Sequence, residues 1–285
     1  GFRFDTDPGI TLEEDLSRRD LTINAIARAP DGTLIDPYGG QKDLANRRLR
    51  HVSDAFTEDP LRILRLAQFQ ARLKGLGFTV DDQTTRLCRE MVARGDLDTL
   101  SRERVFKELE KALNAPHPSD FFAVLASVNA LTRIFQGVQL AETKNLDGPA
   151  TDTSAASRLS QLVLENPDLD LQALNKQLAI PKHWLELAGM TRTWAAAFCQ
   201  VTTLRADAIL EILERGDARR KPVRFAQSVH ISCQSLVIDS AEQARILENW
   251  QRLVQETAKV TLPETAGGLT GQEIKAMIRA EQLRR

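Results

Sequence analysis

Apolar side chains recur at three- and four-residue intervals along most of the chain from Thr57 onward. This spacing puts them on one face of an α-helix, so it predicts a helical array. The predicted helical segments lie near residues 58–74, 81–94, 101–113, 118–129, 155–165, 170–215, 223–237 and 240–258, with a last helix from Gly271. Residues 140–157 are polar and rich in turn-forming types, which predicts an exposed connection.

The first 51 residues follow a different pattern, punctuated by Gly, Pro and Asp and strand-like only in short stretches. The run Ile35-Asp36-Pro37-Tyr38-Gly39-Gly40 predicts a strand end entering a tight turn, because proline and glycine supply the backbone angles that a turn needs. Residues 49–52 predict another short strand. The predicted fold class is therefore mainly α, with a small mixed α/β segment at the beginning.

Composition is that of an ordinary globular protein, with 42% hydrophobic and 27% charged residues. No apolar run approaches the ~18 residues that a membrane-spanning helix needs, and the first residues lack the apolar core of a signal peptide. A cytoplasmic protein without a membrane partner is the simplest interpretation.

The chain carries 38 basic and 39 acidic side chains, a net charge of −1, so any contact with nucleic acid must come from a local patch. The clearest patch is formed by Arg219, Arg220, Lys221 and Arg224. The alternative is that these residues are a solvated helix end with no binding role.

Cysteine and histidine usage excludes several kinds of site. Cys88, Cys199 and Cys233 lie far apart in the sequence, with no CxxC pair or histidine cluster nearby, which argues against a disulfide framework or a zinc site. None of the four histidines is followed by aspartate, so a phosphohydrolase site of the His-Asp type has no ligands. There is also no P-loop, Rossmann glycine pattern or Gly-x-Ser-x-Gly sequence.

The first candidate site is Arg18-Arg19-Asp20, followed by Asn24. Arginine guanidinium groups bind phosphate oxygens in a bidentate manner, and Asp and Asn can hydrogen-bond a ribose hydroxyl. On a helix, Asp20 and Asn24 would share one face. The alternative is a surface ion-pair cluster.

The second candidate site is the predicted helix start at residues 57–65. Thr57 is a candidate cap, acidic residues occupy the first turn, and Pro60 stands near the first helical position. Asp59, Arg62 and Arg65 recur every three residues, so an acceptor and donors could face the edge of a nucleobase. The alternative is that Asp59 satisfies the helix dipole and forms an i, i+3 salt bridge with Arg62.

A third segment, residues 100–109, predicts another helix start. Ser101 is a candidate N-cap, and Arg104 with Glu108 is a candidate i, i+4 pair. This segment is expected to shape a helix start and to do no chemistry.

In order along the chain, these segments resemble the class II tRNA nucleotidyltransferase and poly(A) polymerase family. RRDLTINA at 18–25 is similar to the family's motif B, DPYGGQKDL at 36–44 to motif C, EDPLRILR at 58–65 to motif D, and LSRERVFKEL at 100–109 to motif E. Four ordered motifs between residues 18 and 109 are a specific signal. The remaining residues are less similar.

The resemblance implies roles for the matching residues. The motif that holds the ribose and triphosphate of the incoming nucleotide is matched by Arg18, Arg19, Asp20 and Asn24. Asp59 and Arg62 match an amino-acid template that pairs with the Watson–Crick edge of CTP or ATP, and Arg65 matches a further nucleotide contact. Structural support is implied for Asp36, Gly39, Gly40, Glu58, Arg104 and Glu108.

Two departures from the family pattern affect the expected chemistry. The family's metal-binding Asp-x-Asp precedes motif B, so the ligands of Mg²⁺ are expected upstream, and the chain as given is expected to bind without catalysing. Asp5 and Asp7 imitate the spacing but lack a surrounding strand pattern. Gln68 stands where some members have another arginine, so no triphosphate contact is expected there.

The resemblance implies a truncated α/β nucleotidyltransferase head at 1–51, a helical neck at 52–115, and a helical body and tail at 116–285. The implied reaction is addition of CMP and AMP to tRNA 3′ ends, with the basic patch holding the acceptor end. Two alternatives are a bacterial poly(A) polymerase and a non-catalytic RNA-binding module.

Overall fold

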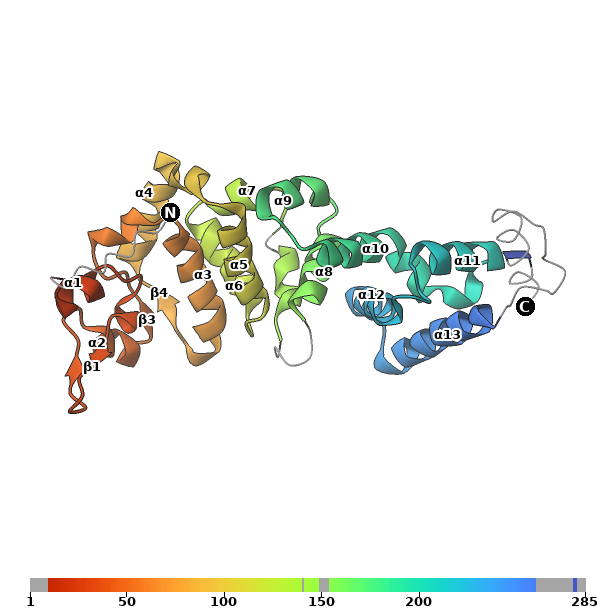
Figure 1. The fold of residues 1–285 in the computed structure, drawn as a ribbon, viewed down its shortest axis with the longest axis horizontal. Helices are drawn as coiled ribbons and strands as arrows, with labels where there is room; N and C mark the ends of the chain where they lie inside the picture. Colours follow the sequence, from red (N-terminus) through yellow and green to blue (C-terminus); the bar gives the residue numbers. More distant parts are fainter. Residues whose placement is uncertain (1–9, 140, 149–153, 260–278, 281–285) are drawn as a thin grey trace. The chain divides into compact units, whose positions relative to one another are not determined.

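The protein is mainly α-helical in a computed structural model that describes residues 10–139, 141–148, 154–259 and 279–280 (Figure 1). It divides into two compact units, one built from the chain up to Ala155 together with Asp168–Ile180, the other from Ala156–Pro167 and the chain from Pro181 onward. The predicted boundaries at 51 and 115 both fall inside the first unit, so the head, neck and body division stays a prediction. Asp5, Asp7 and the predicted helix from Gly271 lie outside the described residues.

The first unit begins with short elements. They are α1 (Leu12–Ser17), β1 (Ala27–Arg28), β2 (Leu34–Ile35), α2 (Gly40–Ala45), β3 (Arg48–Leu49) and β4 (Thr79–Val80). β1 pairs antiparallel with β2, Ala27 opposite Ile35, and β3 pairs parallel with β4, Arg48 opposite Thr79. α1 starts with a capping box in which Thr11 and Glu14 exchange hydrogen bonds.

The predicted turn at Asp36 forms the entrance to α2. The Asp36 carboxylate accepts hydrogen bonds from the backbone N–H groups of Gly40 (2.7 Å) and Gln41 (2.9 Å). Burial opposes its ionisation, but these donors hold the pKa of Asp36 below its usual value. Gly39 has φ +73°, and a Cβ on Gly40 would lie 2.2 Å from the Thr22 carbonyl oxygen. Both glycines are therefore required by the backbone.

The rest of the first unit consists of helices around a common core. These are α3 (Leu61–Leu73), α4 (Asp82–Arg94), α5 (Arg102–Leu113), α6 (Pro118–Ser127), α7 (Leu131–Ile134) and α9 (Leu171–Leu178), joined in places by 3-10 turns such as η1 (Thr22–Asn24), η2 (Asp54–Glu58) and η5 (Ala141–Leu146). α3 packs against both α5 and α6 and is the central helix. The predicted exposed connection at 140–157 is only partly exposed among its described residues, because Thr143 and Leu146 of η5 are buried.

α3 begins later than predicted. Asp59 has extended backbone angles (φ −132°, ψ 102°), Pro60 occupies the N-cap position, and the helix starts at Leu61. The cause is steric, because a proline ring disfavours the helical conformation of the residue before it. Asp59 therefore precedes the helix that carries Arg62 and Arg65, and does not share a helical face with them.

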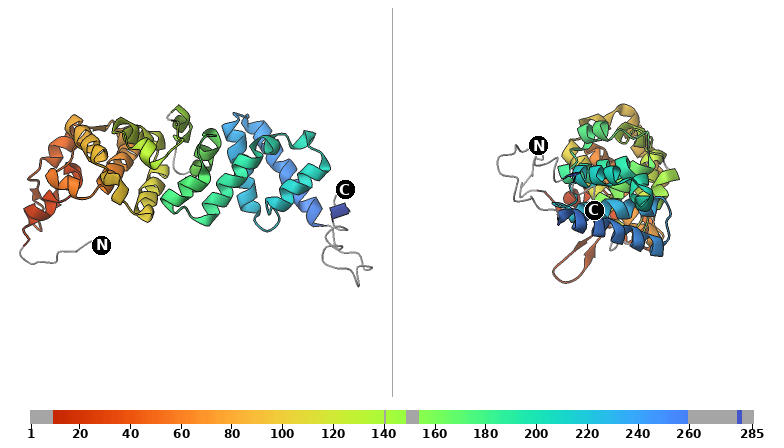
Figure 2. Two further views of the ribbon diagram at one scale, coloured as in Figure 1. Left: turned by 90° about the horizontal axis from the view of Figure 1, so that it is seen from above. Right: turned by 90° about the vertical axis from the view of Figure 1, so that its right-hand side faces the viewer.

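The second unit is a helical bundle. Its helices are α8 (Ala155–Glu165, whose first residue belongs to the first unit), α10 (Lys182–Cys199), α11 (Ala206–Arg215), α12 (Pro222–Ser235) and α13 (Ser240–Ala258). α12 packs against both α10 and α13 (Figure 2). Edge-to-face contacts join Phe198, Phe225 and Trp250 in the core, and the Trp250 indole N–H donates to the Phe198 carbonyl oxygen at 2.9 Å.

Among the described residues, no helix is long and apolar enough to cross a membrane.

The contact at Gly40 predicts a strong effect of a single methyl group. Gly40→Ala is expected to lower the free energy of unfolding of the first unit by about 3 kcal/mol, because the new Cβ collides with backbone atoms. Gly189→Ala is the control. Gly189 lies within α10 and its added Cβ meets no atom within 4 Å, so this variant should be stabilised by about 0.5–1 kcal/mol. Urea unfolding followed by circular dichroism measures both. An unchanged midpoint for Gly40→Ala would contradict the close approach.

Candidate functional site

A hollow of about 660 Å³ opens in the first unit between the segment after α1 and the helices α3 and α5. We call it the arginine pocket. It is lined by Arg18, Arg19, Asp20, Asn24, Asp59, Leu61, Arg62, Arg65, Phe69, Arg104, Lys107 and Glu108. The structure thus brings together, from the segments 18–24 and 59–65, all seven residues expected to bind nucleotide, and α5 completes the lining.

Asp20 is the centre of the hydrogen-bond network on one side of the pocket. Its Oδ1 accepts from the Leu21 backbone N–H (2.8 Å) and from Asn24 Nδ2 (2.9 Å). Its Oδ2 accepts from Arg65 Nε (2.7 Å) and pairs with the terminal Arg65 nitrogen (2.6 Å). The predicted link between Asp20 and Asn24 exists, but a 3-10 turn at Thr22–Asn24 creates it in place of an α-helix.

Asp59 is fixed from the opposite side by α5. Its Oδ1 accepts the Leu61 backbone N–H (3.1 Å), and its Oδ2 pairs with Arg104 at 2.6 Å. The predicted Arg104–Glu108 pair is not what the structure shows, and neither is a salt bridge between Asp59 and Arg62. Arg104 reaches across to Asp59 because that carboxylate precedes α3 and faces the first turn of α5.

Glu108 and Glu58, both expected to give structural support, have different surroundings. Glu108 is buried, with one carboxylate oxygen 2.7 Å from Lys111 and the other without a hydrogen-bond partner among the described residues. Glu58 ends η2, is exposed, and does not line the pocket.

Arg62 lines the pocket, and its guanidinium donates to two backbone carbonyl oxygens, those of Ala55 and Arg18. Burial lowers the pKa of the Arg62 guanidinium, while the nearby carboxylates of Asp59 and Asp20 oppose this shift. Arg62 therefore connects α3 both to η2 and to the segment after α1. It lines the pocket, yet its hydrogen bonds go to the protein's own backbone.

The two adjacent arginines lie at the exposed margin. Arg19 pairs with Asp15 at 3.0 Å and donates to the Asn24 carbonyl oxygen at 3.3 Å. Arg18 is exposed. Both are accessible to a ligand, and neither is buried in a structural ion pair.

Three lining residues, Leu61, Phe69 and Lys107, were not predicted from the sequence. Phe69 lies beneath two guanidinium groups, with its ring centroid 5.8 Å from Arg65 and 5.1 Å from Arg72. Its position four residues after Arg65 on a helix was the available signal. Gln68 is buried in α3 and does not line the pocket.

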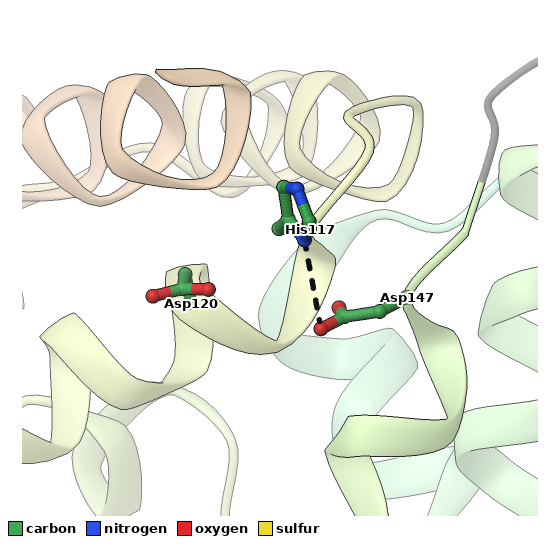
Figure 3. A group of neighbouring side chains, drawn as sticks. All are labelled: His117, Asp120 and Asp147. Atoms are coloured by element: carbon green, nitrogen blue, oxygen red, sulfur yellow. Dashed lines mark ion pairs between the residues drawn. The ribbon is translucent and has the colours of Figure 1, made fainter. Parts of the chain in front are cut away.

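One group of possible metal ligands among the described residues lies elsewhere, at His117, Asp120 and Asp147 (Figure 3). Each carboxylate already has a structural partner. Asp120 pairs with Lys74 at 3.1 Å, and Asp147 accepts from the backbone N–H (2.9 Å) and the hydroxyl (2.6 Å) of Ser119. His117 Nδ1 is 3.9 Å from Asp147. The arrangement is explained as the cap of α6, so we assign no metal to it.

The predicted basic patch belongs to a second hollow, of about 480 Å³, in the second unit. We call it the basic hollow. It is lined by Glu186, Gly189, Met190, Thr193, Trp194, Arg215, Asp217, Arg220, Lys221 and Arg224. The exposed Arg219 lies next to it in sequence but does not line it.

Ion pairs hold most of the cations of the basic hollow. Glu186 accepts from Lys221 at 3.0 Å and also pairs with Arg224, while Arg220 pairs with Asp217 at 2.7 Å. The hydrogen bond from Lys221 lowers the pKa of Glu186. Arg224 is mostly buried, but Arg220 is 84% exposed and remains accessible. The patch therefore combines structural and accessible charges.

Comparison with known proteins gives consistent matches. The family model "Poly A polymerase head domain" matches residues 4–50, and "Probable RNA and SrmB-binding site of polymerase A" matches residues 77–141. The Multifunctional CCA protein of Pseudomonas putida is 38% identical over 296 aligned residues, covering all of this chain and 78% of that protein. That of Alkalilimnicola ehrlichii is 36% identical over 329 aligned residues, covering 100% and 79%.

Solved structures share the fold. A CCA-adding enzyme with ATP has a TM-score of 0.66 at 18% identity, over 96% of this chain and 67% of that one. The Thermotoga maritima CCA-adding enzyme complexed with tRNA has a TM-score of 0.60 at 21% identity, over 96% and 69%. The mainly α architecture predicted from the sequence is confirmed.

The Asp59–Arg104 ion pair predicts a measurable coupling energy. In a double-mutant cycle with Asp59→Asn and Arg104→Gln, we expect about 1 kcal/mol of coupling in urea unfolding, since the pair is half-buried and short. The control cycle uses Asp15→Asn and Arg19→Gln, an exposed pair expected to give roughly 0–0.5 kcal/mol. Equal couplings in the two cycles would show that α5 does not fix Asp59.

Proposed function

Because this chain belongs to the CCA-adding enzyme family, we propose that its arginine pocket selects the nucleotide during addition of CMP and AMP to tRNA 3′ ends. Structures of CCA-adding enzymes in complex with ATP, with CTP and with tRNA give the ligands that this proposal transfers to the chain. CTP, ATP and the tRNA acceptor end are accordingly the proposed partners. The proposed location is the cytoplasm, where tRNA is processed.

The charge of the pocket is the observation that carries the proposal. Its lining has six cationic side chains and three carboxylates, an excess of three positive charges around a hollow of about 660 Å³. Such a concentration of guanidinium groups suits a triphosphate, because arginine binds phosphate oxygens in a bidentate manner. Arg18 and Arg19 are the proposed contacts to phosphate, since both are exposed.

Asp20 and Asn24 are the proposed ribose contacts. Asp20 keeps Arg65 oriented toward the pocket through a short ion pair, and Asn24 donates to the same carboxylate. A ribose hydroxyl can add to this network because it both donates and accepts a hydrogen bond. Phe69, under Arg65, adds an apolar surface at this side.

Base choice is assigned to Asp59 and Arg62. A carboxylate accepts from the exocyclic amine that cytosine and adenine both carry, and a guanidinium donates to a ring nitrogen acceptor. Uracil and guanine present a carbonyl oxygen to the carboxylate in place of that amine. A buried acceptor left unpaired costs about 1–3 kcal/mol, which corresponds to a preference of about five-fold to more than a hundred-fold.

Asp59 and Arg62 already have hydrogen-bond partners in the structure, and these determine which bonds a nucleotide must share or replace. Asp59 keeps unused lone pairs while it is held by Arg104, because each carboxylate oxygen can accept more than one hydrogen bond. Arg62 is already donating to the Ala55 and Arg18 carbonyl oxygens. It must share or exchange these bonds to donate to a base. A small shift of Arg62 is therefore the proposed step that adapts one site first to CTP and then to ATP.

The family's divalent metal does not fit the described carboxylates of the pocket. Asp20 is neutralised by Arg65 and Asp59 by Arg104, and an arginine at that distance excludes a cation. Mg²⁺, the proposed ion, would activate the attacking hydroxyl in this chemistry. We therefore assign no metal ligand among the described residues and derive no catalytic step from them.

The basic hollow is the proposed contact for the acceptor end of the tRNA. Arg219 and Arg220 are exposed, and Arg215 lies 5.8 Å from the ring centroid of Trp194, which gives the hollow an aromatic surface beside its cations. Contacts of this kind hold phosphate and do not read sequence. Lys221 and Arg224 are the proposed structural part of the patch, since Glu186 binds both.

The proposal is tested with the intact protein and tRNA that lacks its 3′-terminal CCA. Incorporation of C followed by A supports CCA addition. Uptake of A alone, in runs, identifies a poly(A) polymerase and overturns the proposal. Absence of any incorporation, with tRNA still bound, identifies a non-catalytic RNA-binding module.

Arg62→Ala is expected to relax the choice between CTP and UTP by ten-fold or more while tRNA affinity changes little, because Arg62 faces the base and not the tRNA body. Competition between the two nucleotides in the incorporation assay, with tRNA affinity measured separately, checks this. Arg72→Ala is the matched control, since Arg72 contacts Phe69 from the same helix without lining the pocket. Unchanged discrimination in Arg62→Ala would remove the template assignment.

The double variant Arg219→Gln/Arg220→Gln is expected to weaken tRNA binding and to reduce the slope of log affinity against log salt by about 2. Filter binding across a range of salt concentrations measures the slope. Arg252→Gln, an exposed arginine of α13 in the same unit, is the control and should leave it unchanged. Equal slopes in both variants would place the tRNA elsewhere.

A further inference from the structure

The second unit brings two free cysteines into contact. Cys199, at the end of α10, and Cys233, near the end of α12, have their sulfur atoms 3.4 Å apart although 34 positions separate them in the sequence. The sequence argued against a disulfide framework because the three cysteines lie far apart. The packing of α12 on α10 brings two of these cysteines close together in space.

The pair occupies one end of a layered interface between these helices. Near the start of both helices, Glu186 of α10 pairs with Lys221 and Arg224. Further along, the buried hydroxyls of Thr191 and Ser228 share a hydrogen bond of 2.9 Å. The thiols follow at the far end. An event at the thiols therefore acts on the same helix pair that forms the basic hollow.

We propose that Cys199 and Cys233 are a dithiol site that a low-molecular-weight disulfide oxidises to an intramolecular disulfide, cross-linking α10 to α12. The two sulfurs need to approach by roughly 1.4 Å to reach the ~2.05 Å of an S–S bond.

The environments of the two thiols set the order of the reaction. Cys199 is partly exposed, and the hydrogen bond from the Cys233 thiol lowers its pKa, whereas the same bond and burial raise the pKa of Cys233. The Cys199 thiolate is thus the attacking group. It forms a mixed disulfide with one half of glutathione disulfide and releases the other half as a thiolate.

The neighbouring thiol completes the exchange. Cys233 loses its proton and attacks the Cys199 sulfur, which breaks the mixed disulfide and releases the second glutathione. The two electrons and two protons lost by the protein end on two molecules of reduced glutathione. An excess of reduced glutathione reverses both steps, so the thiol form persists in a reducing compartment.

The test exposes the folded chain to glutathione disulfide, alkylates the remaining thiols after denaturation, and maps peptides by mass spectrometry without reduction. The expected product has lost two hydrogen atoms and yields a linked Cys199–Cys233 peptide. Cys88 should be recovered as an alkylated thiol, because burial raises its pKa to about 12. Three remaining thiols, or glutathione kept on Cys199 in the wild-type chain, would overturn the proposal.

Single variants separate the two steps. Cys233→Ser is expected to stop at the mixed disulfide on Cys199, and Cys199→Ser should leave Cys233 as a thiol. Cys88→Ser is the matched control and should form the internal disulfide as the wild type does. The cross-link should also raise the melting temperature of the oxidised chain by several degrees, reversibly with dithiothreitol. An unchanged melting temperature after complete cross-linking would show that the disulfide does not stabilise the packing of α10 against α12.

Discussion

The carboxylate of Asp20 collects hydrogen bonds from its neighbour's backbone, from the side chain of Asn24 and from the guanidinium of Arg65. These donors come from a turn and from a helix 45 positions further along the chain. A buried carboxylate with so many donors fixes the geometry of every group that it binds. The Asp20–Arg65 ion pair, together with the hydrogen bond from Arg62 to the Arg18 carbonyl oxygen, links the segment after α1 to α3 across the arginine pocket.

Two further arginines of the pocket are held in the same way, each by oxygen atoms of another segment. Arg104 of α5 binds Asp59, and Arg62 of α3 binds two carbonyl oxygens. Clustered positive charges repel one another, so their proximity costs free energy that these acceptors offset. The result is an electropositive hollow that exists before any anion arrives, which reduces the ordering that binding requires.

Local sequence was sufficient to predict some of these features and insufficient for others. The turn at Asp36 and Gly39 could be predicted because its cause is local backbone geometry, whereas Gly40 is required by the long-range contact with the Thr22 carbonyl oxygen. The helical periodicity likewise predicted most helices within a few residues. The predicted start of α3 was wrong, because the helix-capping pattern does not include the effect of Pro60. The proline ring disfavours the helical conformation at Asp59.

Long-range pairings could not be obtained from spacing. Arg104 could pair with Glu108 one turn away, and only the packing of α5 beside Asp59 decides against it. That Phe69 lines the pocket could not be predicted either. The spacing along α3 does not show which helical face lies beside the other segments of the pocket. The proximity of Cys199 and Cys233 depends on how α10 and α12 pack. Each of these is a property of tertiary structure.

The position of Arg62 has a thermodynamic consequence for any ligand of the pocket. The carbonyl oxygens of Ala55 and Arg18 already accept hydrogen bonds from this guanidinium, so any ligand must compete with them. An incoming molecule gains only the difference between its own acceptor and those two oxygens. Arg62 therefore contributes little to the affinity for any ligand. The difference in affinity between a ligand whose acceptor matches Arg62 and a ligand whose acceptor does not is large compared with that contribution.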